Sequence, residues 1–465
     1  MEVHRGEFTT RLGFILAAAG SAVGLGNIWK FPFEVGNGGG AAFVVLYLTF
    51  CFLLCFPVMV AEIAIGRKTR RNPVGAFLAL NTPKWKIVGQ LGILCGFLIL
   101  SFYNVVAGWA FGYFIEMVTG NFEIGSQFGE FIKDWVKIGL FGMIFMGMTA
   151  YIVSHGIQRG IERAAKFLMP SLIVIMIILL IYSLTLDGAM KGLEFYLIPD
   201  FSKITGSVVY SALGQAFFSL SLGMGALITY GSYLSERQNI VASATMITFM
   251  DVGIAFLAGL MLFPLVFSQG LEPAGGPGLI FVTLPGVFET LGGTIGIIVG
   301  SLFFLLLSFA ALTSTVSLLE VPVAYVVDEY NMERKKAVWL MATLIFLIGI
   351  PSLLSNGASS FWTNFMDIIG IGREGMTDFS FMTFIGWVAN DTFLPLGGML
   401  ISLYAAYIWK KENLSEEISR GYENYRGSIA EKFINFSISY LAPVVLAIIF
   451  VLTVLNRFFG IESIS

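Results

Sequence analysis

Residues 20–32 interrupt an apolar part of the chain with three glycines, an asparagine and a lysine, in the order Gly-Ser-Ala-Val-Gly-Leu-Gly-Asn-Ile-Trp-Lys-Phe-Pro. A second interruption spans residues 220–226, with Ser219 before it and Ser221 within it. In hydrocarbon every backbone amide and carbonyl needs a partner, so such breaks are expected where the freed groups line a cavity or hold a ligand. Two interrupted helices at corresponding places in two halves of a chain predict a secondary transporter with a site at the membrane midplane.

An alternative explanation is that these small residues only let helices pack closely. We favour that explanation for a single glycine pair. Here, however, two interruptions correspond, and Asn27 and Ser219 place polar side chains at them. A paired interruption with polar side chains favours the binding interpretation.

The chemistry of a break follows from the ends of its half-helices, which present carbonyl acceptors at one end and amide donors at the other. We expect the carbonyls of residues 20–23 to face a cation or an ammonium group, and the amides of Leu25 and Gly26 to face a carboxylate. One break can therefore hold both ends of a zwitterion. The side-chain oxygen of Asn27 suits a hard cation such as sodium.

Two further polar features lie inside apolar segments. Thr313, Ser314 and Thr315 follow one another in the segment 295–330, and Asp251 lies well inside the segment 240–268. Hydroxyls in membrane helices usually bond back to a carbonyl of their own helix, but beside the open carbonyls of the first span they would complete an oxygen cage. A carboxylate near the bilayer centre is costly, so Asp251 is expected to meet a cation or to be protonated.

The composition predicts an all-α membrane protein, because 57% of the residues are apolar, only 12% are charged, and the mean hydropathy is +0.83. The charged start of the chain runs directly into the first apolar segment, so no signal peptide is expected. Windows of about 20 residues indicate eleven membrane spans, at residues 12–36, 41–66, 87–119, 136–155, 167–186, 208–233, 240–268, 295–330, 337–354, 380–409 and 433–459.

The distribution of lysine and arginine predicts the orientation. With the amino terminus in the cytoplasm, the inner segments hold 20 of the 27 basic residues, the outer segments hold six, and Lys30 lies within the first span. This asymmetry favours a cytoplasmic amino terminus and, with eleven spans, a carboxyl terminus outside.

Other functional classes lack their usual signals. Three cysteines and two histidines have no metal-ligand spacing, and we interpret the cysteines as small buried hydrophobes. The glycines at 24 and 26 follow the start of a membrane helix rather than a strand, which disfavours a nucleotide site and an ATP-driven pump. No nucleophile, base and orienting group gather on the aqueous faces, so we expect no enzyme and no catalytic residue. The isolated polar clusters also disfavour an ion channel, which needs a continuous polar pore.

The chain resembles the neurotransmitter:sodium symporters, and particularly their bacterial amino-acid transporters. The resemblance covers nearly the whole chain. It rests on Ala22 to Asn27 with Phe31-Pro32, Asn37 to Gly40, Glu62 with Gly66-Arg67, Tyr103 with Trp109, Gln215 to Gly225, Ala310 to Ser314, and Leu394 to Gly398.

The resemblance implies a LeuT-type 5+5 inverted-repeat fold in which helices 1 and 6 are broken and eleven transmembrane helices are present. The first repeat would be residues 12–186, with helices 1 to 5, and the second residues 208–409, with helices 6 to 10. Residues 1–11 would form a cytoplasmic gate segment, and residues 433–459 helix 11.

The resemblance also implies two sodium sites and one substrate pocket. Sodium site one would use the Ala22 carbonyl, Asn27, Ser219 and Asp251. Sodium site two would use the carbonyls of Gly20, Val23 and Ala310 with the hydroxyls of Thr313 and Ser314. The substrate would contact Ala22, Gly24, Leu25, Gly26, Ile99, Tyr103, Val106, Phe218, Ser219, Ser221, Met224, Ser314 and Leu318.

Position 24 indicates the substrate class. Monoamine transporters that resemble this chain carry an aspartate there, which replaces the carboxylate that their substrates lack, whereas this chain has Gly24. A substrate with its own carboxylate, an α-amino acid, is therefore expected. The sequence Gly-Met-Gly at 223–225 is similar to that of members with a broad range of hydrophobic substrates, since a flexible methionine can repack around different side chains.

The expected outer gate departs from the family pattern. The base is Lys30, but Gly386 stands where the family's acidic residue is usual, which leaves Asp378 and Asp391 as alternatives. Tyr103 and Phe218 would complete this gate.

On the inner side the resemblance implies a pair between Arg5 and Asp328 near Tyr233. Gly160 and Pro170 are similar to a helix-5 element thought to unwind and admit water to sodium site two. A proline near the start of an apolar segment is equally an ordinary helix-entry residue.

The sequence thus predicts a sodium-coupled symporter that imports α-amino acids, hydrophobic or aromatic ones, by alternating access. It would lie in the bacterial inner membrane in contact with lipid, use sodium at two sites without chloride, and need neither nucleic acid nor an obligate protein partner. The chloride expectation rests on Asp251, a fixed carboxylate where related transporters resemble one another in having asparagine. A transporter-like amino-acid sensor with little net flux is the alternative.

Overall fold

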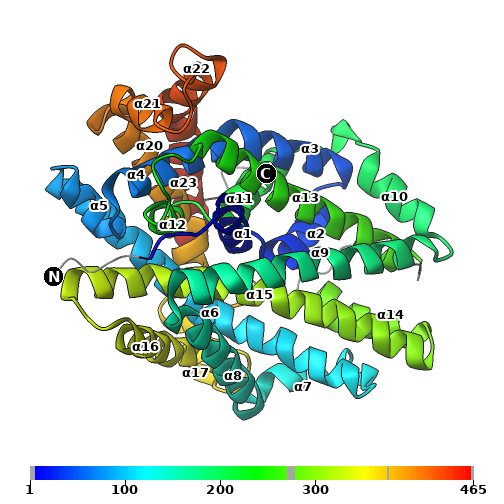
Figure 1. The fold of residues 1–465 in the computed structure, drawn as a ribbon. Coiled ribbons are helices and arrows are strands. Elements are labelled where there is room, and N and C mark those ends of the chain that lie inside the picture. Colours follow the sequence, from blue (N-terminus) through cyan, green and yellow to red (C-terminus); the bar gives the residue numbers. More distant parts are fainter. Residues whose placement is uncertain (1–5, 269, 271–277, 374–375, 377, 462–465) are drawn as a thin grey trace.

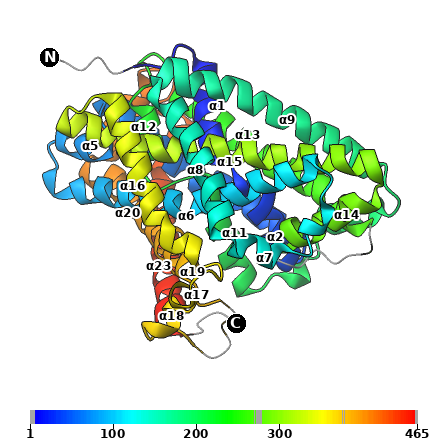
Figure 2. The same ribbon diagram turned by 90° about the horizontal axis from the view of Figure 1, so that it is seen from below.

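The computed structural model describes residues 6–268, 270, 278–373, 376 and 378–461. Within these ranges the chain forms helices and no strand. The helices gather into one bundle, with α1 and α11 near its middle and α9, α15, α6 and α8 along one side (Figure 1). Seen from below, the same bundle carries α17, α18 and α23 toward one end (Figure 2).

The first five spans contain the following elements in chain order: α1 (Arg11–Ala22), η1 (Gly26–Lys30) and α2 (Phe31–Asn37); α3 (Ala41–Phe50), η2 (Cys51–Cys55) and α4 (Phe56–Thr69); α6 (Lys86–Val118); α8 (Trp135–Ser154); η5 (Ile157–Glu162) and α9 (Arg163–Leu184). Between them lie α5 (Pro73–Ala79), η3 (Pro83–Trp85), η4 (Phe122–Ile124) and α7 (Phe128–Lys133).

The later spans follow the same order: α11 (Gly206–Ser219) and α12 (Ala226–Gly231); α13 (Ile240–Phe267); α15 (Gly293–Tyr330); α16 (Arg334–Leu354); α19 (Phe381–Gly386), η8 (Trp387–Phe393), α20 (Leu394–Leu403) and η9 (Tyr404–Ile408); α22 (Ile429–Phe436), η10 (Ser437–Leu441) and α23 (Ala442–Phe459). The connecting elements are α10 (Ala189–Leu197), η6 (Phe201–Lys203), η7 (Leu279–Thr283), α14 (Leu284–Thr290), α17 (Ser360–Thr363), α18 (Phe365–Ile368) and α21 (Lys411–Ser419).

The spans agree with the sequence expectation. Among the described residues, nine helices are long and apolar enough to cross a membrane, and α1 with the Gly26–Asn37 helix forms a tenth that bends by 53°. The interrupted pair α11 and α12 occupies the place of the expected sixth span. Interruptions in the first and sixth spans are therefore present where the glycines predict them.

The two broken spans lie against each other. The first half of span one, α1, contacts α12, and its second half, η1 and α2, contacts α11. The long helices α13, α15 and α9 pack around α1. The freed backbone groups of both breaks are consequently enclosed by other helices rather than by lipid, as hydrocarbon requires.

The fifth span begins earlier than the sequence predicts, at Ile157 instead of residue 167. A π-helical turn, η5, precedes α9 and contains charged residues that lower its apparent hydropathy. Gly160 lies in this turn, where a Cβ atom would be 2.0 Å from the Ile152 carbonyl oxygen, so only glycine allows this close approach. Pro170 lies inside α9, not at its start.

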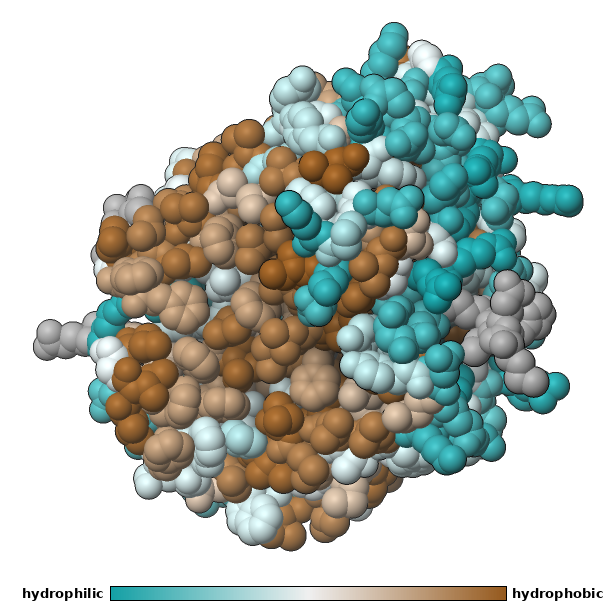
Figure 3. All heavy atoms as spheres, turned by 90° about the vertical axis from the view of Figure 1, so that its left-hand side faces the viewer, coloured by the Kyte–Doolittle hydropathy of each residue, from teal (hydrophilic) through white to brown (hydrophobic). Residues whose placement is uncertain are grey.

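Hydrophobic residues cover most of the face seen in Figure 3, and hydrophilic residues gather along one side of it. Large apolar side chains such as Phe167, Ile181 and Trp339 are exposed. A broad apolar surface of this kind is what a bilayer, rather than water, would cover.

Candidate functional site

The first break lies between Ala22, where α1 ends, and Gly26, where η1 begins. Inside it, the Gly24 amide donates to Asn27 Oδ1 at 3.1 Å and the Leu25 amide donates to the Tyr103 hydroxyl at 3.0 Å. Side chains therefore hold the amides of Gly24 and Leu25, and Leu25 is one of the two residues whose amides the sequence analysis expects to face a carboxylate.

Two hydroxyls of α15 converge on the carbonyl that the break exposes. Thr313 Oγ1 and Ser314 Oγ each lie 3.2 Å from the Val23 carbonyl oxygen, and Thr313 also donates to the Ala310 carbonyl at 2.9 Å. Gly20 lies opposite, since a Cβ atom there would be 3.2 Å from the Thr313 side chain. The structure therefore brings together the five residues expected for sodium site two. Oxygen donors are what a hard cation prefers.

The second break follows Ser219, the last residue of α11. Ser221, Gly223 and Gly225 all have positive φ angles, of 54°, 82° and 73°, before α12 begins. The Ser221 hydroxyl donates to the Ser21 carbonyl at 2.9 Å and so joins the two breaks.

Glu62 of α4 holds this second break, a role that the sequence analysis did not assign. Its side chain is fully buried, and its Oε1 atom accepts a hydrogen bond from the Gly223 amide at 2.8 Å. The signal was present in the sequence as a carboxyl group inside the apolar segment 41–66. An intramembrane carboxyl group is a functional candidate by default.

The residues expected for sodium site one also meet. Asn27 Nδ2 donates to Ser219 Oγ at 3.1 Å and to Asp251 Oδ1 at 2.7 Å. Asp251 Oδ2 accepts from Ser219 Oγ at 2.8 Å and from the Tyr47 hydroxyl at 3.3 Å. Asn27, Tyr47 and Asp251 are fully buried, and Ala22 ends the adjacent half-helix.

The chemistry of this cluster suits sodium. Asp251 forms no ion pair within the part of the chain that the structure describes, although its side chain is fully buried. A buried carboxylate without a basic partner is costly and is stabilised by a bound cation. The described residues contain no group of three or more histidine, cysteine, aspartate or glutamate side chains that would suit a transition metal.

A cavity of about 390 Å³ lies between the two breaks. Eleven of the expected substrate contacts line it together with two further residues, and the full set is Ser21, Ala22, Gly24, Gly26, Ile99, Tyr103, Phe218, Ser219, Ser221, Met224, Ser314, Leu318 and Leu394.

Two expected contacts are not in this wall. Val106 is buried but does not line the cavity, and Leu25 contributes its amide to Tyr103 rather than its side chain to the wall. The sequence analysis missed Ser21 and Leu394 as wall residues. Leu394 reaches the cavity because α20 packs on the second break, where a Cβ atom at Gly223 would lie 2.4 Å from the Leu394 carbonyl oxygen.

Gly24 lies at the closest approach in the site. A Cβ atom at this position would be 2.4 Å from Ser314 Oγ and 2.8 Å from the Tyr103 hydroxyl. Any side chain here therefore displaces one of these polar groups. The site consequently has no carboxylate at position 24, and an acidic side chain there would require the Ser314 or Tyr103 hydroxyl to move.

The start of the described chain packs against the end of α12, where the sequence analysis expects the inner gate. Phe8 is buried and contacts the rings of Tyr230 and Tyr233, and its amide donates to the Tyr233 carbonyl at 3.2 Å. Asp328 accepts hydrogen bonds from the Asn72 amide and side chain, both at 3.0 Å. Its expected partner Arg5 lies outside the described residues.

Tyr233 takes part in a further network that the sequence analysis missed. Its hydroxyl donates to Glu320 Oε1 at 2.7 Å, and the Arg334 guanidinium binds the other oxygen of Glu320 at 2.5 Å. Glu320 is fully buried in α15. The signal in the sequence was again a carboxyl group inside an apolar segment.

The outer gate differs from the family pattern. Gly386 supplies no acid, and the Lys30 ammonium lies 4.5 Å from the centre of the Phe218 ring. Of the two alternatives, Asp378 accepts from the Ser380 amide at 2.8 Å and so caps its own helix. Asp391 instead lines a cavity that also contains Lys30.

Two breaks, a hydroxyl run and a buried aspartate together form the candidate site. The profile of the sodium:neurotransmitter symporter family matches residues 5–127 and 135–459. The chain belongs to this family. It is 37% identical to an uncharacterized sodium-dependent transporter of Bacillus subtilis, YhdH, over 96% of each chain.

The chain is also similar to two other transporters. The crystal structure of MhsT in complex with L-phenylalanine superimposes with a TM-score of 0.85, at 43% identity, over 96% of this chain and 99% of that one. A sodium- and chloride-dependent betaine transporter of Caenorhabditis elegans is 27% identical over 83% of this chain and 74% of its own length. These matches confirm the resemblance and the LeuT-type helical fold. The chain is a sodium-dependent, multi-pass membrane transporter.

Proposed function

We propose that this symporter imports hydrophobic or aromatic α-amino acids together with sodium by alternating access. The observation that carries the proposal is the close packing around Gly24: no acidic side chain is present at this position, and the Ser314 and Tyr103 hydroxyls lie where one would be. A substrate must then bring its own carboxylate to the Leu25 and Gly26 amides and the Tyr103 hydroxyl. Its ammonium group would face the carbonyls of Ala22 and Ser219 at the two half-helix ends.

The preference for apolar side chains follows from the wall of the cavity. Ile99, Met224, Leu318 and Phe218 all line the cavity. Methionine adapts to aliphatic and aromatic groups because its side chain is flexible and polarizable. The bound phenylalanine in MhsT, a relative with 43% identity, supports this substrate class.

Two sodium ions would be carried with the substrate. The first would take Ala22, Asn27, Ser219 and Asp251, and the second Gly20, Val23, Ala310, Thr313 and Ser314. Both clusters consist of oxygen ligands from the first span and from neighbouring helices, α11 and α13 for the first ion and α15 for the second. Because each ion binds groups from more than one span, sodium would favour the conformation in which these spans are joined.

Chloride would not be required. The Tyr47 and Ser219 hydroxyls already donate to Asp251 Oδ2, a fixed negative charge within the sodium cluster. An exchangeable anion beside this carboxylate would meet like charge instead of compensating the cations.

The wider arrangement belongs to the same proposal. Residues 12–186 and 208–409 would be two inverted repeats, with 1–11 as a cytoplasmic gate segment and 433–459 as the eleventh helix. The chain would lie in the bacterial inner membrane with its amino terminus inside and its carboxyl terminus outside. It would work in contact with lipid and without nucleic acid, an obligate protein partner or a catalytic residue.

The test is a thermal-stability screen of the purified protein against the twenty amino acids, in sodium and in potassium. A ligand that binds the folded state raises its stability according to its concentration and affinity. We expect stabilisation by apolar α-amino acids in sodium only. Counterflow of the labelled amino acid in proteoliposomes then distinguishes transport from the sensor alternative, for which binding without exchange is expected.

A further inference from the structure

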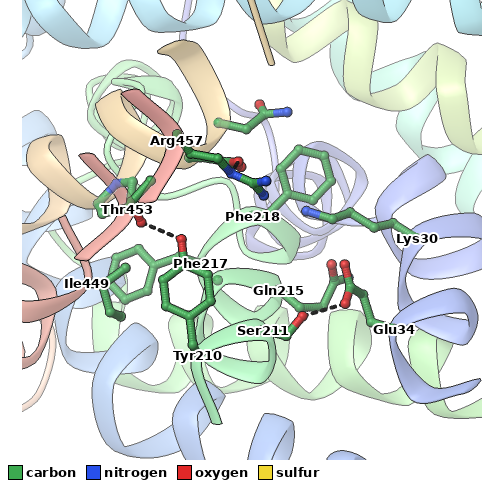
Figure 4. A pocket seen from close by; sticks show the side chains of 14 residues that line it. Lys30, Glu34, Tyr210, Ser211, Gln215, Phe217, Phe218, Ile449, Thr453 and Arg457 are labelled. Carbon is green, nitrogen blue, oxygen red and sulfur yellow. Dashed lines mark hydrogen bonds and ion pairs between the residues drawn. The ribbon is translucent and has the colours of Figure 1, made fainter. Parts of the chain in front are cut away.

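A second cavity, of about 520 Å³, lies on the other side of Phe218 from the substrate cavity. Phe218 lines both cavities, so its ring lies between them. Four charged side chains line the second cavity: Lys30, Glu34, Asp391 and Arg457 (Figure 4).

Asp391 of η8 and Arg457 of α23 form an ion pair in this cavity, with Arg457 Nε 3.0 Å from Asp391 Oδ2. The guanidinium also lies 5.2 Å from the centre of the Trp387 ring. Arg373 donates to the Asn456 carbonyl at 2.9 Å and so fixes the end of the helix that carries Arg457. The last helix therefore places a positive charge beside Asp391.

A hydrogen bond ties the same helix to the second broken span. The Tyr210 hydroxyl of α11 lies 2.5 Å from Thr453 Oγ1 of α23, as the dashed line in Figure 4 shows. The carboxylate of Glu34 is in contact with the Ser211 hydroxyl of α11. Glu34 lies one turn after Lys30 on the same helix, so a pair between these two would not join different parts of the cavity.

Lys30 is the remaining charge of the cavity. It forms no ion pair within 4.0 Å among the described residues, and its ammonium lies 4.5 Å from the centre of the Phe218 ring. Asn390, next to Asp391, also lines the cavity, and its Oδ1 atom is buried without a hydrogen-bond partner. A lysine ammonium has three donors, which suit a carboxylate oxygen and a neighbouring amide oxygen.

We propose that Asp391 is the acid of the outer gate in this transporter, that Lys30 pairs with it when the outer cavity closes over Phe218, and that Arg457 of the last helix is the residue that positions it. The acid would thus come from one turn or more beyond position 386, where this chain has glycine. Arg457 would hold one oxygen of Asp391 through its rigid fork and leave the other oxygen for Lys30.

The exposure of the pair suits a gate. The side chains of Arg457 and Asp391 are 37% and 24% exposed. Ion pairs with this much contact with water contribute only about 0–1 kcal/mol, so the carboxylate can share a second cation without a large cost. A fully buried pair would instead lock the cavity in one state.

The inference rests on the proposed function, and its test uses a cysteine reporter in the cavity. Gly214 lines the cavity, and a Cβ atom there meets nothing within 4 Å. The native cysteines, Cys51, Cys55 and Cys95, are buried. An uncharged maleimide would be reacted with the Gly214→Cys protein in sodium, with and without phenylalanine, after uptake by this variant has been verified.

We expect phenylalanine to slow labelling of the reporter at least tenfold, and Asp391→Asn or Arg457→Ala to reduce this protection to less than twofold. Arg457→Lys should protect partially, because it keeps the charge without the fork. Asp378→Asn is the matched control, because the Asp378 carboxylate caps its own helix. In this variant phenylalanine should protect the reporter as it does in the parent. Sodium-dependent stabilisation by phenylalanine, measured on the same variants, should persist, which a merely destabilised site would not show.

A double-mutant cycle provides the decisive arm. Lys30→Gln and Asp391→Asn should each lose protection, and the double variant should lose no more than either single variant, because all three remove the same pair. Full protection in Asp391→Asn and Arg457→Ala, or additive losses in the double variant, would overturn the inference. If the parent shows no stabilisation by any amino acid, the proposed function fails instead. In that case the labelling rate of the reporter is measured in sodium and in potassium. A ratio of these two rates that is the same in the parent, Asp391→Asn and Arg457→Ala would overturn the assignment of the gate.

Discussion

Asn27 Nδ2 lies 2.7 Å from Asp251 Oδ1, and this contact joins the break in the first span to the middle of α13. The other carboxylate oxygen of Asp251 accepts from Tyr47 and Ser219. One buried carboxylate thus connects α13 to three other spans around the expected first sodium ion. Such a fully hydrogen-bonded group rigidifies the site that surrounds it.

Asp251→Asn should impair uptake while wild-type uptake persists when chloride is replaced by gluconate. The variant removes the fixed negative charge that compensates the cations and leaves the Tyr47 and Ser219 hydroxyls able to face an added anion. We therefore expect chloride to restore part of the activity of the variant. The measurement is sodium-driven uptake of labelled amino acid in proteoliposomes. Wild-type uptake that collapses without chloride would contradict this role of Asp251.

The double variant Thr313→Ala, Ser314→Ala should weaken sodium affinity at least tenfold. Each substitution removes one oxygen ligand of the sodium ion. We estimate the contribution of each ligand to the binding free energy at roughly 1–2 kcal/mol, by analogy with hydrogen bonds to charged groups. The measurement is the sodium concentration that gives half-maximal stabilisation or uptake. Ser308→Ala is the matched control, because Ser308 is buried on the same helix and bonds only to its own Phe304 carbonyl. Unchanged sodium activation in the double variant would remove the assignment of site two.

Tyr103→Phe should weaken amino-acid binding by roughly 1–3 kcal/mol, the cost of leaving a buried polar group without one partner. The hydroxyl lies 3.0 Å from the Leu25 amide, at the end of the cavity expected to hold the carboxylate. Tyr113→Phe on the same helix is the control, since that hydroxyl donates to the Ile124 carbonyl away from the cavity. Competition binding with tyrosine and tyramine extends the test. Equal competition by the amine would refute the argument from the carboxylate.

Glu62→Ala should destabilise the second break, and Glu62→Gln should not do so to the same extent. The Gly223 amide loses its acceptor in the alanine variant, which we expect to cost about 1–3 kcal/mol, whereas glutamine keeps an acceptor oxygen at that place. Thermal unfolding and the affinity for the amino acid would be measured for both variants. If the two variants lose equal stability, the hydrogen bond to Gly223 is not the reason for the carboxyl group at position 62.

Much of the fold could be predicted from the sequence because the bilayer imposes strong constraints. The thickness of the bilayer sets the length of the apolar segments. Because its interior holds no water, glycine-rich interruptions free backbone groups that need other partners, and such interruptions therefore indicate binding sites. The breaks at 23–25 and 220–225 and the hydroxyl run at Thr313 and Ser314 could be predicted from residue types and spacing, whereas the importance of Gly24 came from the resemblance to the family. The hydropathy of the sequence did not predict the start of the fifth span, because the turn Ile157–Glu162 is helical but contains charged residues.

The sequence by itself therefore determined that this chain is a helical membrane protein with two broken spans and polar groups at the breaks. Only the tertiary structure decided which of those polar groups meet. Tyr47 and Asp251 are 204 residues apart, and Asp391 and Arg457 are 66 residues apart, yet each pair is in contact. Sequence periodicity describes neighbours on one helix, whereas these contacts depend on how separate helices pack, so no local pattern distinguishes Asp391 from Asp378 as the partner of Arg457.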